Sequence, residues 1–142
     1  MPHANLRKRL QGLVSVTILL LLLAAAVAFA DKQLIEAEEG GVVNIASGAD
    51  LVIPPKALKE DTIVSAYMEE GSELVTFTFG PDDLRFSKPA MLYISLSLID
   101  ALGNIDDLTL YGEDGKKLKP KLTQGILEYR IKHFSLYYYR RR

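Results

Sequence analysis

Residues 73–79, with the sequence ELVTFTF, decide the fold of this chain. Apolar side chains alternate there with two threonines, and a period of two gives a strand one apolar face. Residues 62–68 show the same strand-forming composition, and the segment EEGS at 69–72 favours a turn between the two stretches. We therefore expect residues 62–68 and 73–79 to form a β-hairpin with one buried face.

The same signals recur at short spacing along the rest of the chain. Gly80-Pro81-Asp82-Asp83 and Asp114-Gly115 supply turn chemistry, and Phe77, Phe79 and Phe86 are expected core aromatics. Further strands are expected at residues 41–46, 50–53, 91–98, 108–111, 117–122, 126–131 and 134–139. Helix is expected at most as one turn over 56–60 or in a segment over 100–107 that Gly103 breaks. This pattern predicts an all-β chain with a single antiparallel β-sandwich.

The first 30 residues have the three-part layout of a secretory leader. The basic segment 7–9 precedes an apolar run over residues 13–30, which ends in Ala-Phe-Ala. This layout predicts a signal peptide cut between Ala30 and Asp31. The alternative is an uncleaved signal anchor, with residues 13–30 as a transmembrane helix and membrane tether. Both place the rest of the chain across the membrane, either secreted or periplasmic, or anchored in the cytoplasmic membrane with the C-terminus outside.

Beyond the leader, we expect a flexible acidic linker over residues 31–39 and the sandwich over residues 40–142. All 18 acids and 14 of the 17 Lys and Arg residues lie after residue 30, which gives this part a net charge of −4. An acidic module is a poor nucleic-acid binder, because phosphates demand a basic face. The chain has no cysteine, which excludes a disulfide framework, a thiol nucleophile and a zinc–thiolate site.

Three segments together resemble the ZU-5 domain, a β-sandwich shared by zonula occludens scaffolds, ankyrins and netrin receptors. They are LVIPPKAL at 51–58, FGPDDLRFSKPA at 79–90 and HFSLY at 133–137. Their order and spacing fit the family over residues 40–139. The family usually has glycine at the position of Lys56 and often at that of Asp83. The resemblance implies a sandwich that binds proteins through its surfaces and edges.

The segment His133-Phe134-Ser135 is the one motif that could carry chemistry. Some relatives of the ZU-5 domain cut themselves at a His-Phe-Ser sequence, between Phe and Ser. The resemblance implies that the Ser135 hydroxyl would attack the Phe134 carbonyl, with His133 as the base or as the residue that holds a strained peptide bond. The alternative is structural: His133 caps a turn, Phe134 fills the core and Ser135 hydrogen-bonds the backbone.

Three acidic pairs fall in expected loops, at residues 82–83, 106–107 and 113–114. Calcium binding would require these loops to converge, because calcium takes six to eight oxygen ligands. The alternative is that they are solvated turn residues, a role that suits aspartate.

Aromatic and basic residues gather near the end of the chain. Residues 137–142, YYYRRR, would suit a membrane headgroup layer or an anionic envelope polymer. The alternative is a final edge strand whose alternate tyrosines pack inward, followed by a solvated basic tail. Four lysines over residues 116–121 alternate on an expected exposed strand, where they would discourage pairing between edges.

These observations favour an exported, non-enzymatic interaction or structural module of the cell envelope or extracellular space. Its partner would be an envelope or extracellular protein, not a nucleic acid. We expect no cofactor and no resident metal ion. The alternatives are an autoproteolytic domain that uses Ser135 and His133, and a calcium- or glycan-binding sandwich.

Overall fold

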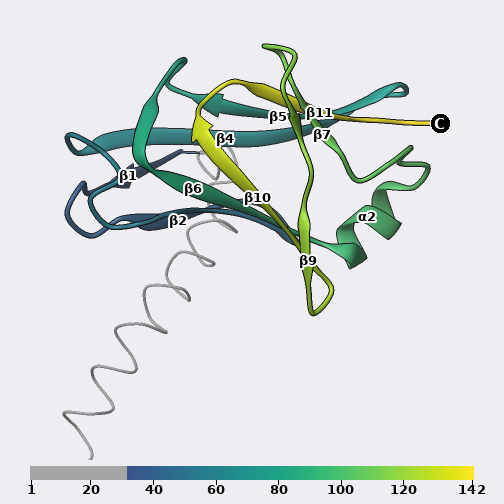
Figure 1. Cartoon of the computed structure of the whole chain (residues 1–142), viewed down its shortest axis with the longest axis horizontal. Helices are drawn as coiled ribbons and strands as arrows, with labels where there is room; N and C mark the ends of the chain where they lie inside the picture. The colour runs from purple at the N-terminus through teal and green to yellow at the C-terminus, as the bar shows by residue number, and fades with distance from the viewer. Residues whose placement is uncertain (1–31) are drawn as a thin grey trace, which may run out of the picture. The chain divides into compact units, whose positions relative to one another are not determined.

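The computed structural model describes residues 32–142, which fold as two antiparallel β-sheets (Figure 1). The six-stranded sheet has the order β1 (Lys32–Ile35), β4 (Thr62–Glu70), β5 (Leu74–Gly80), β11 (Leu136–Arg140), β7 (Leu110–Gly112) and β8 (Lys117–Leu118). The five-stranded sheet has the order β2 (Gly41–Ala46), β3 (Ala49–Ile53), β6 (Arg85–Ser95), β10 (Ile126–His133) and β9 (Lys121–Thr123). The predicted all-β class is confirmed. The predicted leader, tether and Ala30–Asp31 cleavage site lie outside the described residues.

The two sheets enclose one hydrophobic core. On β5, Val75, Phe77 and Phe79 are at most 1% exposed, so the alternation expected of residues 73–79 is confirmed. Leu92 and Ile94 of β6 are fully buried in the other sheet and belong to the same core cluster. Figure 1 shows β4, β5 and β11 in one layer and β2, β6 and β10 in the other. Burial of these apolar faces is the main force that holds the layers together.

Two hairpins form where the sequence predicts them. β4 and β5 pair from Glu70↔Val75 onward, and the Gly71 N–H donates to the Leu74 carbonyl at 2.8 Å. β7 and β8 join through a turn in which Gly115 has φ = 85° and the Asp114 Oδ1 accepts the Lys116 N–H. Glycine reaches this left-handed region without a steric penalty.

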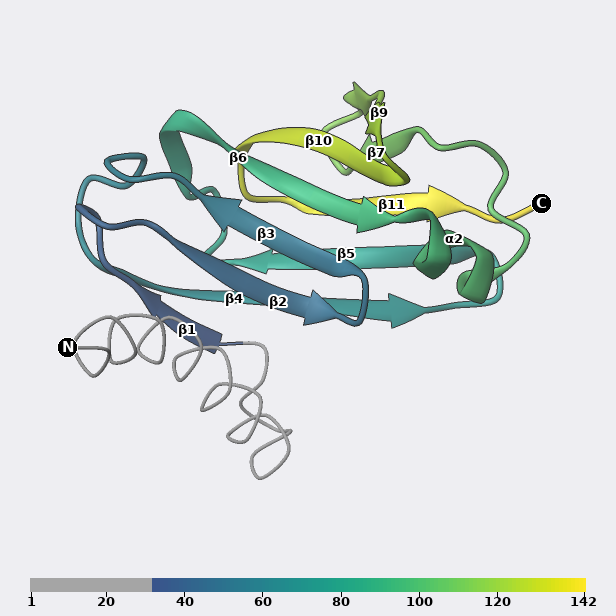
Figure 2. The ribbon, with the colours of Figure 1, turned by 90° about the horizontal axis from the view of Figure 1, so that it is seen from below.

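The strand expected over residues 91–98 is wrong for its last three residues, which are helical. β6 ends at Ser95, and helix α2 (Leu96–Leu102) comes next. The Ser95 Oγ accepts the Leu98 N–H at 3.1 Å, which satisfies one of the free amides at the helix start. The helix ends at Gly103, with φ = 70°. Figure 2 shows α2 at the end of β6, near the end of β11.

The expected linker over residues 31–39 is also wrong for most of its length. Residues 32–35 form β1, which pairs with β4 in the register Gln33↔Val64. Ile35 is 1% exposed, so core packing holds the strand in place. A tight turn then ends at Gly40, where a Cβ would lie 2.2 Å from the Ile53 carbonyl oxygen. Only glycine fits that approach.

The single strand expected over residues 117–122 is in fact two strands in different sheets. β8 extends the six-stranded sheet beside β7, whereas β9 extends the five-stranded sheet beside β10. Pro120 lies between them and has no N–H for a ladder, which favours a break at this position. The chain therefore crosses from one sheet to the other here.

Candidate functional site

Strand β10 has a paired half and an open half. On one side it pairs with β6 from Ile126↔Ser95 to Ile131↔Ala90. On the other side, β9 pairs only as far as Lys121↔Glu128. Within residues 32–142, no strand continues along that side of β10 beyond Glu128.

The hydrogen-bond pattern decides which backbone groups of β10 face this open side. The Leu96 N–H donates to the Gly125 carbonyl at 2.9 Å, so even-numbered residues of β6 point toward β10. Antiparallel pairs alternate between bonded and non-bonded positions. Odd-numbered residues of β10 therefore bond β6, and even-numbered ones face away from it. The N–H and C=O of Arg130 consequently face the open side, and those of Lys132 point in the same direction.

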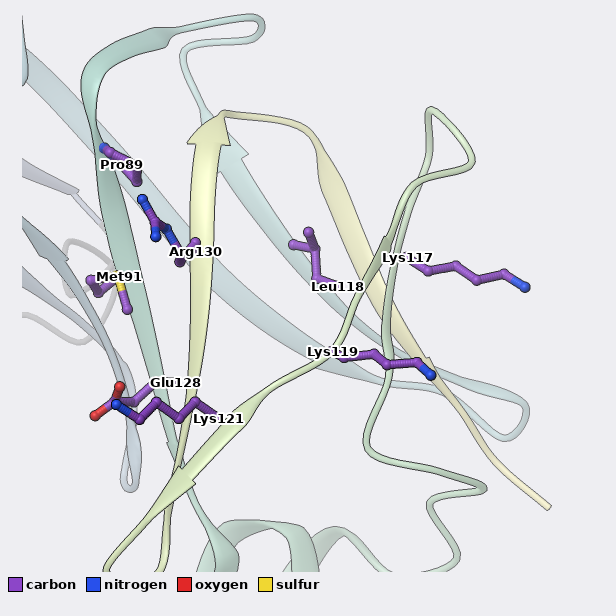
Figure 3. A pocket seen from close by; sticks show the side chains of 8 residues that line it. All are labelled: Pro89, Met91, Lys117, Leu118, Lys119, Lys121, Glu128 and Arg130. Atoms are coloured by element: carbon purple, nitrogen blue, oxygen red, sulfur yellow. The ribbon is translucent and has the colours of Figure 1, made fainter.

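A groove lies along this open side, which we call the basic groove (Figure 3). It consists of two adjoining cavities of about 510 and 410 Å³ that share Leu118 and Arg130. Its lining residues are Pro89, Met91, Lys116, Lys117, Leu118, Lys119, Lys121, Glu128, Arg130, Lys132, His133 and Tyr137.

The groove concentrates positive charge on a module that is acidic as a whole. Six of the 14 Lys and Arg residues beyond residue 30 line it, against the single carboxylate of Glu128. A concave surface lined by one sign of charge raises the local concentration of opposite charges. The groove is therefore suited to a negatively charged ligand.

Figure 3 shows how the charged side chains are arranged. Arg130 points toward Pro89, and Lys121 lies beside Glu128 from the neighbouring strand. Lys117 and Lys119 come from the segment that leads into β9, and their side chains point away from β10. The basic side chains thus leave the gap beside β10 unfilled.

The residues of the His133-Phe134-Ser135 motif are held by separate partners. Phe134 is fully buried, stacks on Phe79 at 5.2 Å between ring centroids, and packs edge-on against Phe86 at 5.0 Å. Its N–H donates to the Leu84 carbonyl at 2.8 Å. This placement agrees with the expectation that Phe134 fills the core.

The imidazole and the hydroxyl of the motif point to different groups. The His133 Nε2 lies 3.4 Å from the Asp114 Oδ2, and the His133 carbonyl accepts the Tyr137 hydroxyl at 2.8 Å. The Ser135 Oγ has its one contact of hydrogen-bond length, 3.5 Å, with the Leu136 carbonyl. Within residues 32–142, no hydrogen bond joins Ser135 to His133, so the pairing needed for a serine and its base is not formed.

Two of the three acidic pairs, at residues 106–107 and 113–114, make side-chain contacts within the described part of the chain. The Asp107 carboxylate accepts the Thr109 N–H and the Tyr111 hydroxyl, and the Asp106 Oδ1 lies 3.8 Å from the Arg142 Nε. Within the described part of the chain, no group of three His, Cys, Asp or Glu residues could hold a metal ion.

The tyrosine-rich segment lies in the middle of a sheet. β11 has β5 on one side and β7 on the other, so the edge strand expected here is wrong. Tyr137 and Tyr139 are buried, as the alternation predicts. Burial raises the pKa of Tyr137 to about 12 and that of Tyr139 further.

The basic tail is not free in solution either. The Arg141 guanidinium donates to the carbonyls of Leu102 and Gly103 at 2.6 Å each, and to that of Gly71 at 2.8 Å. Carbonyls at a helix C-terminus lack partners in the helix, and a cation is favourable there. Arg141 therefore joins the end of α2 to the β4–β5 turn.

The groove is the part of the site that the sequence did not reveal. Arg130 and Lys132 alternate with the buried Tyr129 and Ile131, so the solvent-facing basic side of β10 could have been recognised. The sequence does not show which strand lies beside β10. Alternation within β10 does not reveal how far β9 extends along it.

A scan against protein-family models and a search of curated proteins both find no match to this chain. Among residues 32–142, helix length and hydropathy give no segment able to span a membrane.

Proposed function

We propose that this protein is a non-enzymatic binding module whose basic groove takes an acidic segment of a partner protein. The concentration of six cations beside one carboxylate, on a module of net charge −4, carries this proposal. Such asymmetry costs self-repulsion among the cations. An anionic partner would offset this repulsion. Lysines scattered over the surface would not repel one another in this way, so their clustering favours a binding role.

We further propose that the module is ZU-5-like. Two observations support this assignment beyond the three sequence segments. Lys56 has φ = 64° and Asp83 has φ = 59°, and the family usually has glycine at the first of these positions and often at the second. A left-handed backbone at both sites fits a fold in which glycine is the usual residue. The buried Phe134 fits the role that the third segment would have in such a sandwich.

The proposed location is the outer side of a membrane, and the partner is an envelope or extracellular protein. The basic, apolar and small-residue layout of residues 1–30 supports this part of the proposal. An exported module meets partners that cytoplasmic scaffolds do not.

Charge reversal in the groove tests the binding proposal. The probe is a capped, fluorescent heptapeptide of alternating Glu and Val, added to the full chain in mild detergent. We expect the triple variant Lys119→Glu, Lys121→Glu, Arg130→Glu to weaken binding at least tenfold. The matched control reverses Lys56, Lys59 and Lys88, which are exposed and outside the groove, and should bind like the wild type. Equal affinity for all three proteins would overturn the proposal.

The intact mass of the purified chain tests the non-enzymatic part. We expect no fragment that ends at Phe134, because the Ser135 hydroxyl and the His133 imidazole have separate partners. A fragment that is present in the wild type and lost in Ser135→Ala would instead support self-cleavage.

A further inference from the structure

The open side of β10 lacks a strand at the position where the sheet would continue. β9 begins only at Lys121, and Pro120 just before it favours a break where the chain arrives from the other sheet. In the register of the β9–β10 pair, Lys119 would have faced Arg130, but no such pair forms. The alternation of bonded pairs turns the Arg130 N–H and C=O away from β6, and no strand of residues 32–142 pairs with β10 on the side that they face. An unpaired edge of this kind is a template for an added strand.

We propose that the partner binds by strand addition, as an extended segment hydrogen-bonded to the β10 edge at Arg130 and Lys132. This inference rests on the proposed binding function of the basic groove and specifies how the ligand is held. Main-chain hydrogen bonds give affinity in this mode of recognition, and alternate side chains give specificity. The open edge spans residues 129–133, so about five ligand residues fit beside it.

The two faces of the groove predict the pattern of the ligand. Glu128, Arg130 and Lys132 point to the outer face of the sheet, because Tyr129 and Ile131 between them are buried. Side chains of an added strand that share the outer face would lie beside Arg130 and Lys132, which favours acids. Side chains on the other face would meet Leu118 and Tyr137, which favours small apolar residues. The ligand is therefore an alternating acidic and apolar segment.

A second copy of this chain does not fit the same edge. Antiparallel pairing of two open edges over residues 129–133, centred on Ile131, would place Arg130 of each copy directly opposite Lys132 of the other, and like charges in that position are destabilising. The surrounding lysines act in the same direction, since edge lysines oppose the pairing of identical chains. Charge thus selects a heterologous, acidic strand over self-association.

Backbone-modified probes test strand addition without altering the protein. The heptapeptide of alternating Glu and Val is compared with two forms of itself, one N-methylated on its Glu residues and one on its Val residues. A strand added beside β10 directs only every second amide toward it. We therefore expect one methylated form to lose at least tenfold in affinity and the other to bind like the parent. Loss with the Glu set indicates antiparallel addition, and loss with the Val set indicates parallel addition.

Two outcomes separate failure of this inference from failure of the proposed function. If the parent and both methylated peptides bind equally, charge alone holds the ligand, and strand addition is overturned while the groove remains a binding site. If the parent peptide does not bind, both proposals fail.

A variant pair gives an independent check. Arg130→Pro and Arg130→Ala both remove the charge, but only proline removes the N–H that faces the groove. Proline is tolerated where the N–H of a strand faces solvent. We expect Arg130→Pro to bind the peptide at least fivefold more weakly than Arg130→Ala. Equal binding by two folded variants would count against strand addition. In the wild type, peptide binding should slow hydrogen exchange at the Arg130 amide, and unchanged exchange would also count against it.

Discussion

Strands β10 and β11 are consecutive in the chain, yet they differ in how many neighbours they have. β11 is hydrogen-bonded on both sides, to β5 and β7. β10 has β6 along one side but loses β9 after Glu128. Both strands bury alternate side chains, with tyrosine in each. Similar sequence patterns thus produce one closed strand and one half-open strand, and the difference arises from segments elsewhere in the chain.

The outer faces of the two strands differ in the same way. On β11, Tyr138 stacks on Tyr111 at 5.6 Å between centroids, and the Arg140 guanidinium lies 4.1 Å from the Tyr111 ring centroid. On β10, Arg130 and Lys132 are exposed and line a groove. The cation on β11 is used within the protein, whereas those on β10 remain available to a ligand. The candidate site is distinguished by cations that remain available to a ligand, and not by the number of its charges.

Strands β10 and β11 both bury tyrosines, and alkaline pH should ionise them. We expect this change to destabilise the protein more than any variant below. Burial raises the pKa of Tyr137 to about 12, from 10.0, and also raises the pKa values of Tyr129 and Tyr139. A raised phenol pKa contributes stability that is complete below pH 10 and is lost as pH rises through 12. We expect loss of the sheet signal in circular dichroism over that window. Complete phenolate absorbance with an intact sheet would contradict this.

Phe134→Ala should lower the free energy of unfolding, because Phe134 packs in the core where β10 leads into β11. Its ring is fully buried between Phe79 and Phe86, and such truncations cost about 3–5 kcal/mol. Urea unfolding of the full chain measures the loss. Phe86→Ala is the matched control, because Phe86 is only half-buried and should lose less. Equal losses would show that Phe134 has no special role at the junction.

The hydrogen bond between Tyr129 and Tyr139 links the strands through the core, and its two ends are not equivalent. The Tyr129 hydroxyl donates to the Leu108 carbonyl at 2.6 Å, so it must accept from the Tyr139 hydroxyl, also at 2.6 Å. Tyr139→Phe leaves the bond to Leu108 intact and should cost about 1 kcal/mol.

Tyr129→Phe leaves both the Leu108 carbonyl and the Tyr139 hydroxyl without this partner. It should therefore cost about 1–3 kcal/mol, more than Tyr139→Phe. The same unfolding measurement compares the two variants, and the reverse order would show that the hydroxyls are oriented the other way.

The smallest expected effect on stability concerns the two arginines on the outer faces of β11 and β10. Arg140→Ala removes the cation over the Tyr111 ring and should lower the Tm slightly, by less than any variant above. Arg130→Ala removes no hydrogen bond or ion pair within the described chain and should leave the Tm unchanged. A larger loss for Arg130→Ala would mean that its side chain is part of the structure instead of a ligand-binding group.

Patterns within single segments predict much of this fold. The alternation at residues 73–79 and the turn at Asp114-Gly115 both produce the hairpins that they indicate. Alternation misleads where Leu96 and Leu98 continue the apolar pattern of β6, because the Ser95 cap starts a helix there. The acids near Ile35 likewise obscure β1, whose single buried side chain decides its placement.

The candidate site depends on pairings that no single segment contains. The four lysines of residues 116–121 alternate as one strand would, but Pro120 divides them between two sheets. The open edge at Arg130 results from that division, because β9 is too short to cover it. Strand length and strand choice depend on distant packing partners, so the groove emerges only when the whole sheet is assembled.

The position of β11 also has a consequence for the timing of folding. β1, β4 and β5 are made early and pair with one another, whereas β7 and β8 join them only through β11. During synthesis from the N-terminus, the six-stranded sheet therefore remains in two pieces until residues 136–140 emerge. Pairings of long sequence separation form slowly. The six-stranded sheet should thus close only after nearly all of the chain has been made, and such late closure would suit the export proposed above.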